Sequence, residues 1–236
     1  MQVKEFINNP NKAVTLLGMS GAGKSHISAF MGGWGWNIYS CDYEIGAKYL
    51  KDKLFVSVDN ISALSDYLGR IGEFPLDKFI ARQKSYYDAE IAALGAMEVT
   101  DGCFIHDSTG SLCEIEDKNL MQKIGEQTLF VYLKTSAAEE RELLQRAYDY
   151  PKPLFFPPEF LAQNLKIYLS EFNINNLDDI VSDEFSHWIF PKLFEARKPK
   201  YQSLADKYGV TIPSSEFRNL KSADEFVEII AKYLER

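Results

Sequence analysis

Short apolar runs alternate along most of the chain with longer segments in which apolar residues recur every three or four positions. A short apolar run that ends in glycine or a polar residue is typical of a buried strand, and the wider spacing is typical of a helix packed on one face. Strands separated by helices pair in parallel, so the pattern predicts an α/β fold with a parallel sheet covered on both faces. The strands are expected at residues 13–18, 37–42, 102–107, 128–134 and 208–213.

The helices between these strands have recognisable ends. In residues 136–148, Ser136 stands as an N-cap with Glu139 three positions later, which is the spacing of a capping box. The apolar spacing of residues 61–97 is broken once by Gly-Glu-Phe-Pro and predicts two helices. Further helices are expected at residues 24–31 and 223–234.

Residues 150–197 do not follow this alternation. They contain five of the nine prolines and many aromatic residues, and none of their apolar runs has the pattern of a strand. We expect an insertion that folds over the top of the sheet, with helices from Pro158 to Ser170 and from Asp183 onward.

Composition and charge narrow the function classes. The 236 residues are 46% hydrophobic and 25% charged, which suits one substantial core with a smaller appended lobe. The net charge of -8 argues against a protein that coats itself on nucleic acid, so any phosphate site must be local. The cysteines lack C-x-x-C spacing and the histidines are scattered, so no zinc site or disulfide framework is expected. No apolar run has the length of a membrane span, and we expect a cytoplasmic protein without membrane or nucleic-acid partners.

Residues 18–25, Gly-Met-Ser-Gly-Ala-Gly-Lys-Ser, match the P-loop pattern G-x-x-x-x-G-K-[ST] and stand between a predicted strand and a predicted helix. The glycines let backbone N–H groups converge on an anion, Lys24 reaches the β- and γ-phosphates, and the Ser25 hydroxyl can bind Mg²⁺. The alternative is a glycine-rich turn in which Lys24 is a solvated residue of the first helical turn. The nucleotide-binding residues expected here are Gly18, Ser20, Gly21, Ala22, Gly23, Lys24, Ser25 and His26.

Two aspartates follow predicted strands. Asp107 ends the strand at 102–107, from which a carboxylate can hold Mg²⁺ beside Ser25; the alternative is an aspartate that caps the next turn. His106 alternates to the opposite side of that strand and is expected to be a buried, hydrogen-bonded imidazole. Asp42 follows the strand at 37–42, at the sheet edge where ligands of α/β folds gather. It could orient or deprotonate a substrate hydroxyl, or serve only as the N-cap of a helix that starts near Tyr43.

With these residues the chain resembles shikimate kinase and its relatives, which are small P-loop kinases. The family has Asp-x-Asp after its second strand; residues 40–42 keep only the second aspartate, Asp42, which in the family contacts the acceptor alcohol. In the predicted lid, Arg146 stands where the family has an arginine near the adenine, and Lys152 replaces an arginine that reaches the transferring phosphate. In Ala-Arg-Lys-Pro-Lys-Tyr, Arg197 takes the place of an acceptor-binding arginine.

The chain also departs from the family. Residues 86–90, Tyr-Tyr-Asp-Ala-Glu, stand where the family has Phe-Arg-x-x-Glu, so that Tyr87 replaces the arginine that grips the shikimate carboxylate. Residues 108–111 replace three consecutive glycines. The resemblance therefore implies an acceptor other than shikimate. Arg82, one helical turn earlier, could supply a substitute cation, or could be solvated or paired with an acid such as Asp88.

Motif and resemblance together predict a three-layer α/β/α P-loop NTPase with a five-stranded parallel sheet and an extended, mostly helical lid. Residues 1–149 and 198–236 are expected to form the nucleotide-binding core, which includes a helical acceptor-binding region at 43–98. Residues 150–197 are expected to form the lid.

The resulting hypothesis is a kinase that uses ATP and Mg²⁺ to phosphorylate a hydroxyl of a small metabolite. Its catalytic residues would be Lys24, Asp42 and Lys152, and its metal ligands Ser25 and Asp107. Asp42, Arg82, Tyr87 and Arg197 would bind the acceptor, and Arg146 the nucleotide. The alternative is a P-loop ATPase or nucleotide-dependent switch whose lid binds a protein partner.

Overall fold

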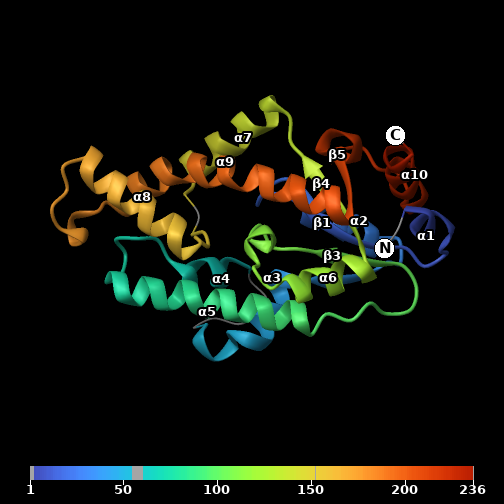
Figure 1. The fold of residues 1–236 in the computed structure, drawn as a ribbon, viewed down its shortest axis with the longest axis horizontal. Helices are drawn as coiled ribbons and strands as arrows, with labels where there is room; N and C mark the ends of the chain where they lie inside the picture. The colour runs from blue at the N-terminus through green and yellow to red at the C-terminus, as the bar shows by residue number, and fades with distance from the viewer. Residues whose placement is uncertain (1–2, 55–60, 152, 236) are drawn as a thin grey trace. The chain divides into compact units, whose positions relative to one another are not determined.

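The computed structural model describes residues 3–54, 61–151 and 153–235 (Figure 1). Contacts divide the chain into two compact units, and helices α5, α7 and α9 each contribute residues to both. The first unit comprises Met1–Cys41, Leu94–Arg141 and Arg197–Arg236, and the second comprises Asp42–Ala93 and Glu142–Ala196.

The first unit is built on a five-stranded parallel sheet with the strand order β2-β3-β1-β4-β5. All five predicted strands form. In register, Asp107 at the end of β3 lies opposite Leu16 of β1 and Ser40 of β2, so the carboxyl ends of these strands share one edge. The strands are β1 (Ala13–Leu17), β2 (Asn37–Ser40), β3 (Phe104–Asp107), β4 (Leu129–Lys134) and β5 (Gly209–Pro213).

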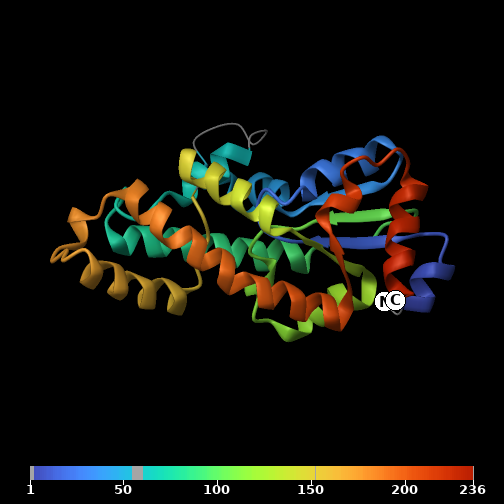
Figure 2. The same cartoon turned by 90° about the horizontal axis from the view of Figure 1, so that it is seen from above.

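Helices cover both faces of this sheet, as predicted (Figures 1 and 2). Alternate residues of β1 and β4, such as Leu16 and Val131, join one core cluster with α2 and α10. On the other face, Phe130 and Tyr132 of β4 contact the rings of Tyr208 and Tyr201 from α9. The helices of this unit are α1 (Val3–Asn8), α2 (Lys24–Gly33), α6 (Lys118–Gln127), α10 (Ala223–Leu234), the first part of α7 (Ala137–Asp149) and the last part of α9 (Ser182–Tyr208).

The predicted capping box begins α7 (Ala137–Asp149). The Ser136 N–H donates to the Glu139 carboxylate at 2.7 Å, and the Glu139 N–H donates to the Ser136 hydroxyl at 3.3 Å. Glu139 also accepts hydrogen bonds from the hydroxyl of Ser214 and the guanidinium of Arg218, both at 2.8 Å. One carboxylate thus joins the start of α7 to the segment that follows β5.

The second unit has a helical core of its own. Phe79 of α5 packs in one cluster with Tyr168 of α8 and with Phe185 and Ile189 of α9, so segments from 43–98 and 150–197 share this core. The two helices predicted in 61–97 and the two predicted in 150–197 all form. Its elements are α3 (Cys41–Glu44), which begins one residue before the unit, a π-helical turn (Ile45–Tyr49), α4 (Ile61–Leu68), α5 (Leu76–Gly95) and α8 (Pro158–Glu171).

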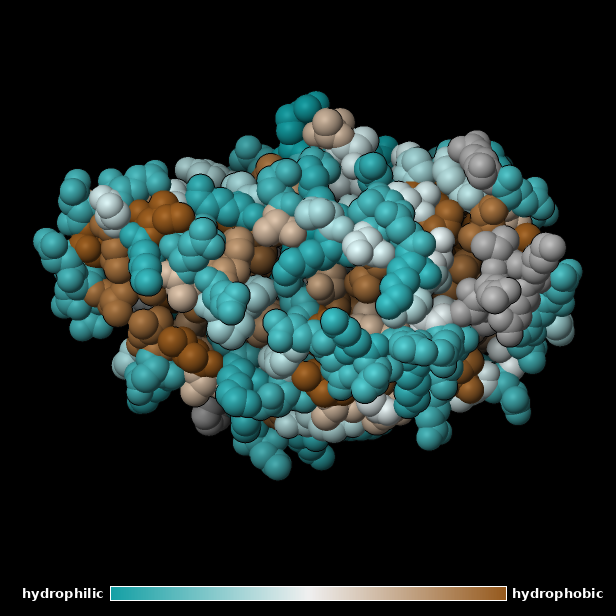
Figure 3. Space-filling view, viewed as in Figure 1, coloured by the Kyte–Doolittle hydropathy of each residue, from teal (hydrophilic) through white to brown (hydrophobic). Residues whose placement is uncertain are grey.

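Part of the surface of this unit is hydrophobic, as Figure 3 shows near α8 and α9. Ile167 on α8, Phe172 just after α8 and Val181 just before α9 are each about half exposed. Among the described residues, no helix is both long and apolar enough to cross a membrane.

Candidate functional site

The P-loop connects β1 to α2 through glycines in conformations that other residues rarely adopt. Gly18, Gly21 and Gly23 have φ angles of 145°, 87° and 99°. A Cβ at Gly18 would lie 3.4 Å from the Leu133 carbonyl oxygen, which is an ordinary contact, so the φ angle and not the available space requires glycine there. The turn is closed by a hydrogen bond of 3.1 Å from the Ala22 N–H to the Met19 carbonyl. These angles explain why the turn needs glycine at these positions.

The loop leads directly into the N-terminus of α2, which begins at Lys24. The Ile27 N–H donates to the Gly23 carbonyl at 3.0 Å. Ser25 and His26 come before Ile27, so their amides are among the first of the helix, which have no acceptor within it. Amides at a helix N-terminus, together with the helix dipole, attract anions. The His26 ring packs against Phe30 on α2 with ring centroids 4.5 Å apart, so only the backbone amide of His26 belongs to this group of N-terminal amides.

Lys24 is buried, with 6% of its surface exposed. Its Nζ donates to the carbonyl oxygens of Gly18 at 2.7 Å and of Met19 at 3.2 Å. The alternative of a solvated first-turn lysine is therefore wrong. The backbone of the loop thus binds the ammonium group, and a polyanion bound by the loop amides would lie close to it.

Asp107 and Ser25 lie together at the carboxyl edge of the sheet. The Ser25 hydroxyl donates a hydrogen bond to the buried Asp107 carboxylate. Burial raises the pKa of Asp107, and the Lys24 ammonium and the Ser25 hydrogen bond oppose that rise only in part. The following turn is made by Thr109, whose hydroxyl accepts the Ser111 N–H at 3.2 Å, and not by an Asp107 cap.

The oxygen donors of Ser25 and Asp107 fit Mg²⁺, which takes one or two carboxylates and completes its shell with water and substrate phosphates. A larger protein cage is not present in the described parts of the chain, where no three His, Cys, Asp or Glu residues are grouped to hold a metal.

His106 is buried on the face of β3 opposite Asp107, as predicted. Its Nδ1 lies 3.2 Å from the hydroxyl of Thr15, which in turn lies 2.7 Å from the hydroxyl of Thr128. Its Nε2 has no hydrogen-bond partner among the described residues, so the imidazole is only partly satisfied. Burial, with the nearby Lys24, lowers the pKa of His106 to about 3, and the ring is neutral.

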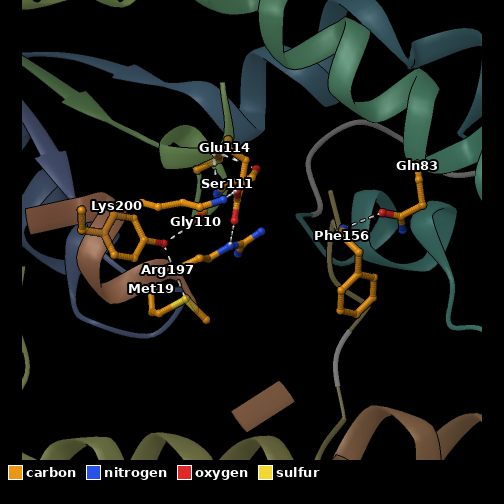
Figure 4. Close-up of polar contacts among 10 residues, drawn as sticks. Met19, Gln83, Gly110, Ser111, Glu114, Phe156, Arg197 and Lys200 are labelled. Atoms are coloured by element: carbon orange, nitrogen blue, oxygen red, sulfur yellow. Dashed lines mark hydrogen bonds and ion pairs between the residues drawn. The ribbon is translucent and has the colours of Figure 1, made fainter. Parts of the chain in front are cut away.

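The loop after β3 packs against the P-loop. A Cβ at Gly110 would lie 3.2 Å from the Ser20 nitrogen, which is tighter than an ordinary contact. The hydroxyl of Tyr201 on α9 donates to the Gly110 carbonyl and lies 3.5 Å from Sδ of Met19 (Figure 4). Ser108 donates to the Leu16 carbonyl in β1. The backbone around the P-loop is therefore held from two neighbouring segments.

Arg197, predicted to bind the acceptor, is buried in an ion pair. Its Nε donates to Oε1 of Glu114 at 2.9 Å, and the other carboxylate oxygen pairs with Nζ of Lys200 (Figure 4). Glu114 and Lys200 were not predicted. The spacing of Arg197, Lys200 and Tyr201 on one helix face could have indicated a shared partner, whereas nothing local in the sequence indicates that Glu114 is buried.

Asp42 follows β2 and is the second residue of α3, so it is not the N-cap of that helix. It belongs by its contacts to the second unit.

The other predicted acceptor residues pack against aromatic side chains of the same unit. Tyr87 stacks on Phe155 with ring centroids 5.5 Å apart. The guanidinium of Arg82 lies 3.8 Å from the ring centroid of Phe74 and donates to the Tyr67 carbonyl at 2.8 Å. Asp88, the acid suggested as a partner for Arg82, is paired with Lys84 at 2.6 Å.

Of the two residues predicted to act from the lid, the structure describes only Arg146. Arg146 is exposed on α7, and its Nε lies 3.4 Å from the Glu142 carbonyl oxygen. Lys152 lies outside the described residues. Just beyond it, the buried amide of Gln83 on α5 donates to the Leu154 carbonyl at 3.0 Å and accepts the Phe156 N–H at 2.8 Å (Figure 4). This anchor was not predicted.

No family model matches the chain, and no curated protein matches it by sequence. Among solved structures, it is similar to shikimate kinase from Bacteroides thetaiotaomicron, with 13% identity, a TM-score of 0.52, and coverage of 95% of this chain and 99% of that one. Shikimate kinase from Acinetobacter baumannii in complex with shikimate aligns with 14% identity, a TM-score of 0.45, and coverage of 96% and 93%. The first similarity shows that the chain has the shikimate kinase fold, as the motif resemblance predicted.

Proposed function

We propose that this chain is an ATP-dependent kinase that transfers the γ-phosphoryl group of ATP to a hydroxyl of a small metabolite. The observation that carries the proposal is the P-loop, in which Lys24 is buried and Ser25 is hydrogen-bonded to Asp107. All these groups lie in the first unit, around one turn between β1 and α2.

The phosphate side of the reaction would depend on charge and position. The loop amides and the N-terminus of α2 would bind phosphate oxygens, and the Lys24 ammonium would oppose the negative charge on the transferring group. Ser25 and Asp107 would hold Mg²⁺, which when bound neutralises charge on the β- and γ-phosphates. Phosphoryl transfer needs little more from a protein than such positioning and electrostatic stabilisation.

On the acceptor side, Asp42 would orient the attacking hydroxyl and accept its proton. Arg82, Tyr87 and Arg197 would line the acceptor site, and Arg146 and Lys152 would act from the lid on the nucleotide and the transferring phosphate.

We propose that the acceptor is not shikimate. Tyr87 replaces a carboxylate-binding arginine and is stacked on Phe155, and Arg82, the candidate substitute, is engaged with Phe74 and Tyr67.

The test is ATP turnover by the purified protein, alone and with a fractionated metabolite pool, followed by mass spectrometry for a product that has gained one phosphoryl group. We expect slow turnover alone and a sharp rise with the right fraction. Lys24→Ala should lose ATP binding and turnover, and Lys123→Ala, on α6, is the matched control. Wild-type binding in Lys24→Ala would refute the site. Turnover that rises only with a protein partner, without a phosphorylated metabolite, would support the switch instead.

A further inference from the structure

A buried carboxylate stands between two cationic side chains in the first unit. Glu114 ends a short 3-10 turn (Leu112–Glu114) after β3, and it pairs with Nε of Arg197 through one oxygen and with Nζ of Lys200 through the other. The side chains of Glu114 and Arg197 are each 3% exposed. Figure 4 shows the carboxylate enclosed between the two cations.

This cluster lies beside the P-loop. Tyr201 is one helical turn beyond Arg197 on α9, and its hydroxyl contacts the Gly110 carbonyl and Sδ of Met19. Glu114 belongs to the segment that follows Asp107 and Gly110. A ligand group that reached Arg197 would therefore be close to the phosphate-binding turn.

Glu114 already supplies a counter-charge to both cations without a ligand. A buried guanidinium is costly unless an anion and hydrogen-bond acceptors surround it, and Glu114 supplies both. Burial by itself lowers the pKa of Arg197, but Tyr201, Cys113 and Glu114 raise it, so the guanidinium stays charged.

We propose that Glu114 is an internal counter-ion that fills the anion-binding position formed by Arg197 and Lys200, and that the acceptor consequently carries no carboxylate at this position. This inference rests on the proposed function, because only a kinase has an acceptor. An incoming carboxylate would have to share two cations with a buried carboxylate, and two like charges in one buried site strongly disfavour each other. A neutral hydroxyl compound meets no such repulsion.

The first test removes the counter-ion and offers a small substitute. We measure the melting temperatures of wild type and Glu114→Ala in sodium formate and in sodium chloride at equal ionic strength. Formate is expected to raise the melting temperature of Glu114→Ala by about 3 °C or more above its value in chloride, because a ligand that binds only the folded state stabilises it. Wild type should show no such difference.

The matched control is Glu140→Ala. Glu140 pairs with Lys198 on the same stretch of α9 at 3.2 Å, but that pair is partly exposed. Formate should not rescue this variant, because water already solvates its cation. Equal responses of Glu114→Ala to formate and chloride, or equal rescue of both variants, would overturn the proposal.

The second test uses Glu114→Gln, which keeps the side-chain volume and removes the charge, and it decides the matter if Glu114→Ala does not fold. Binding of shikimate and of its neutral methyl ester is compared by ligand-observed NMR. We expect Glu114→Gln to bind shikimate about tenfold more tightly than wild type does, with ester binding unchanged. Unchanged shikimate binding would refute an internal counter-ion.

Both measurements report binding, not catalysis. If the wild-type protein phosphorylates no acceptor, the proposed function fails, and the formate and shikimate comparisons still decide whether Arg197 and Lys200 form an anion site.

Discussion

Replacing Glu139 with alanine should destabilise the protein by about 2 to 3 kcal/mol at neutral pH. The carboxylate accepts the Ser136 N–H at 2.7 Å and the Ser214 hydroxyl and Arg218 guanidinium at 2.8 Å. A capping interaction typically contributes about 1 kcal/mol, and each of the two hydrogen bonds from Ser214 and Arg218 to this partly exposed carboxylate adds about 0.5 to 1 kcal/mol. The sum corresponds to a melting temperature lower by roughly 5 to 10 °C in a chain of this size.

The same contacts give this loss a distinct pH dependence. Burial acts to raise the pKa of Glu139, but the hydrogen bonds from Ser136, Ser214 and Arg218 outweigh it and lower the pKa from 4.5 to about 2. A carboxyl group whose pKa is depressed in the folded state stabilises that state above the unfolded pKa and loses the effect as pH falls through the folded pKa. The difference between wild type and Glu139→Ala should be full above pH 5.5 and shrink from about pH 4.5 towards 2.

The assay is urea unfolding followed by far-UV circular dichroism at several pH values, with Glu216→Ala as the control. Glu216 lies in the same region and pairs with Lys232 only at 3.6 Å, so its removal should change stability by less than about 0.5 kcal/mol. A loss in Glu139→Ala that stayed the same at pH 3 as at pH 7 would refute the linkage argument. A loss no larger than that of Glu216→Ala at pH 7 would refute the magnitude.

Three further changes test the site. Asp42→Asn should keep ATP affinity and lose transfer, as isothermal titration and product analysis would show; equal damage to ATP binding would make Asp42 a nucleotide-site residue. Gly110→Ala should weaken ATP binding about tenfold, because its Cβ would press on the Ser20 nitrogen at 3.2 Å, while Gly95→Ala, with open space around its Cβ, should not. Gln83→Leu should cost about 2 to 4 kcal/mol in urea unfolding, because the Leu154 carbonyl and Phe156 N–H lose their partner; an unchanged midpoint would contradict this.

Features that depend on short-range patterns could be predicted from the sequence. The five strands and the capping box at Ser136 follow from apolar runs and cap spacing, and the P-loop follows from its motif. Helix α6 was missed because it is largely polar, although Asp117 caps it by accepting the N–H groups of Asn119 and Leu120 at 3.0 Å.

Features that depend on distant partners could not be predicted. Whether Arg82 is solvated, paired with an acid or stacked on Phe74 is decided by the packing of α4 and α5, which periodicity does not describe. The burial of Glu114 likewise requires α9 to bring two cations to a turn more than eighty residues earlier. The family resemblance predicted an acceptor-binding cation at Arg197, and only the fold shows that Glu114 is paired with it.

The strand order has a consequence for how the molecule forms as it is synthesised. β1 and β2 are consecutive strands along the chain, yet they do not pair with each other, because β3 lies between them. The central strand, β1, therefore pairs only with β3 and β4, which begin at Phe104 and Leu129. Since contacts this distant in sequence form slowly, we expect the turn that follows β1 to gain its support from the sheet only after β3 and β4 have been made.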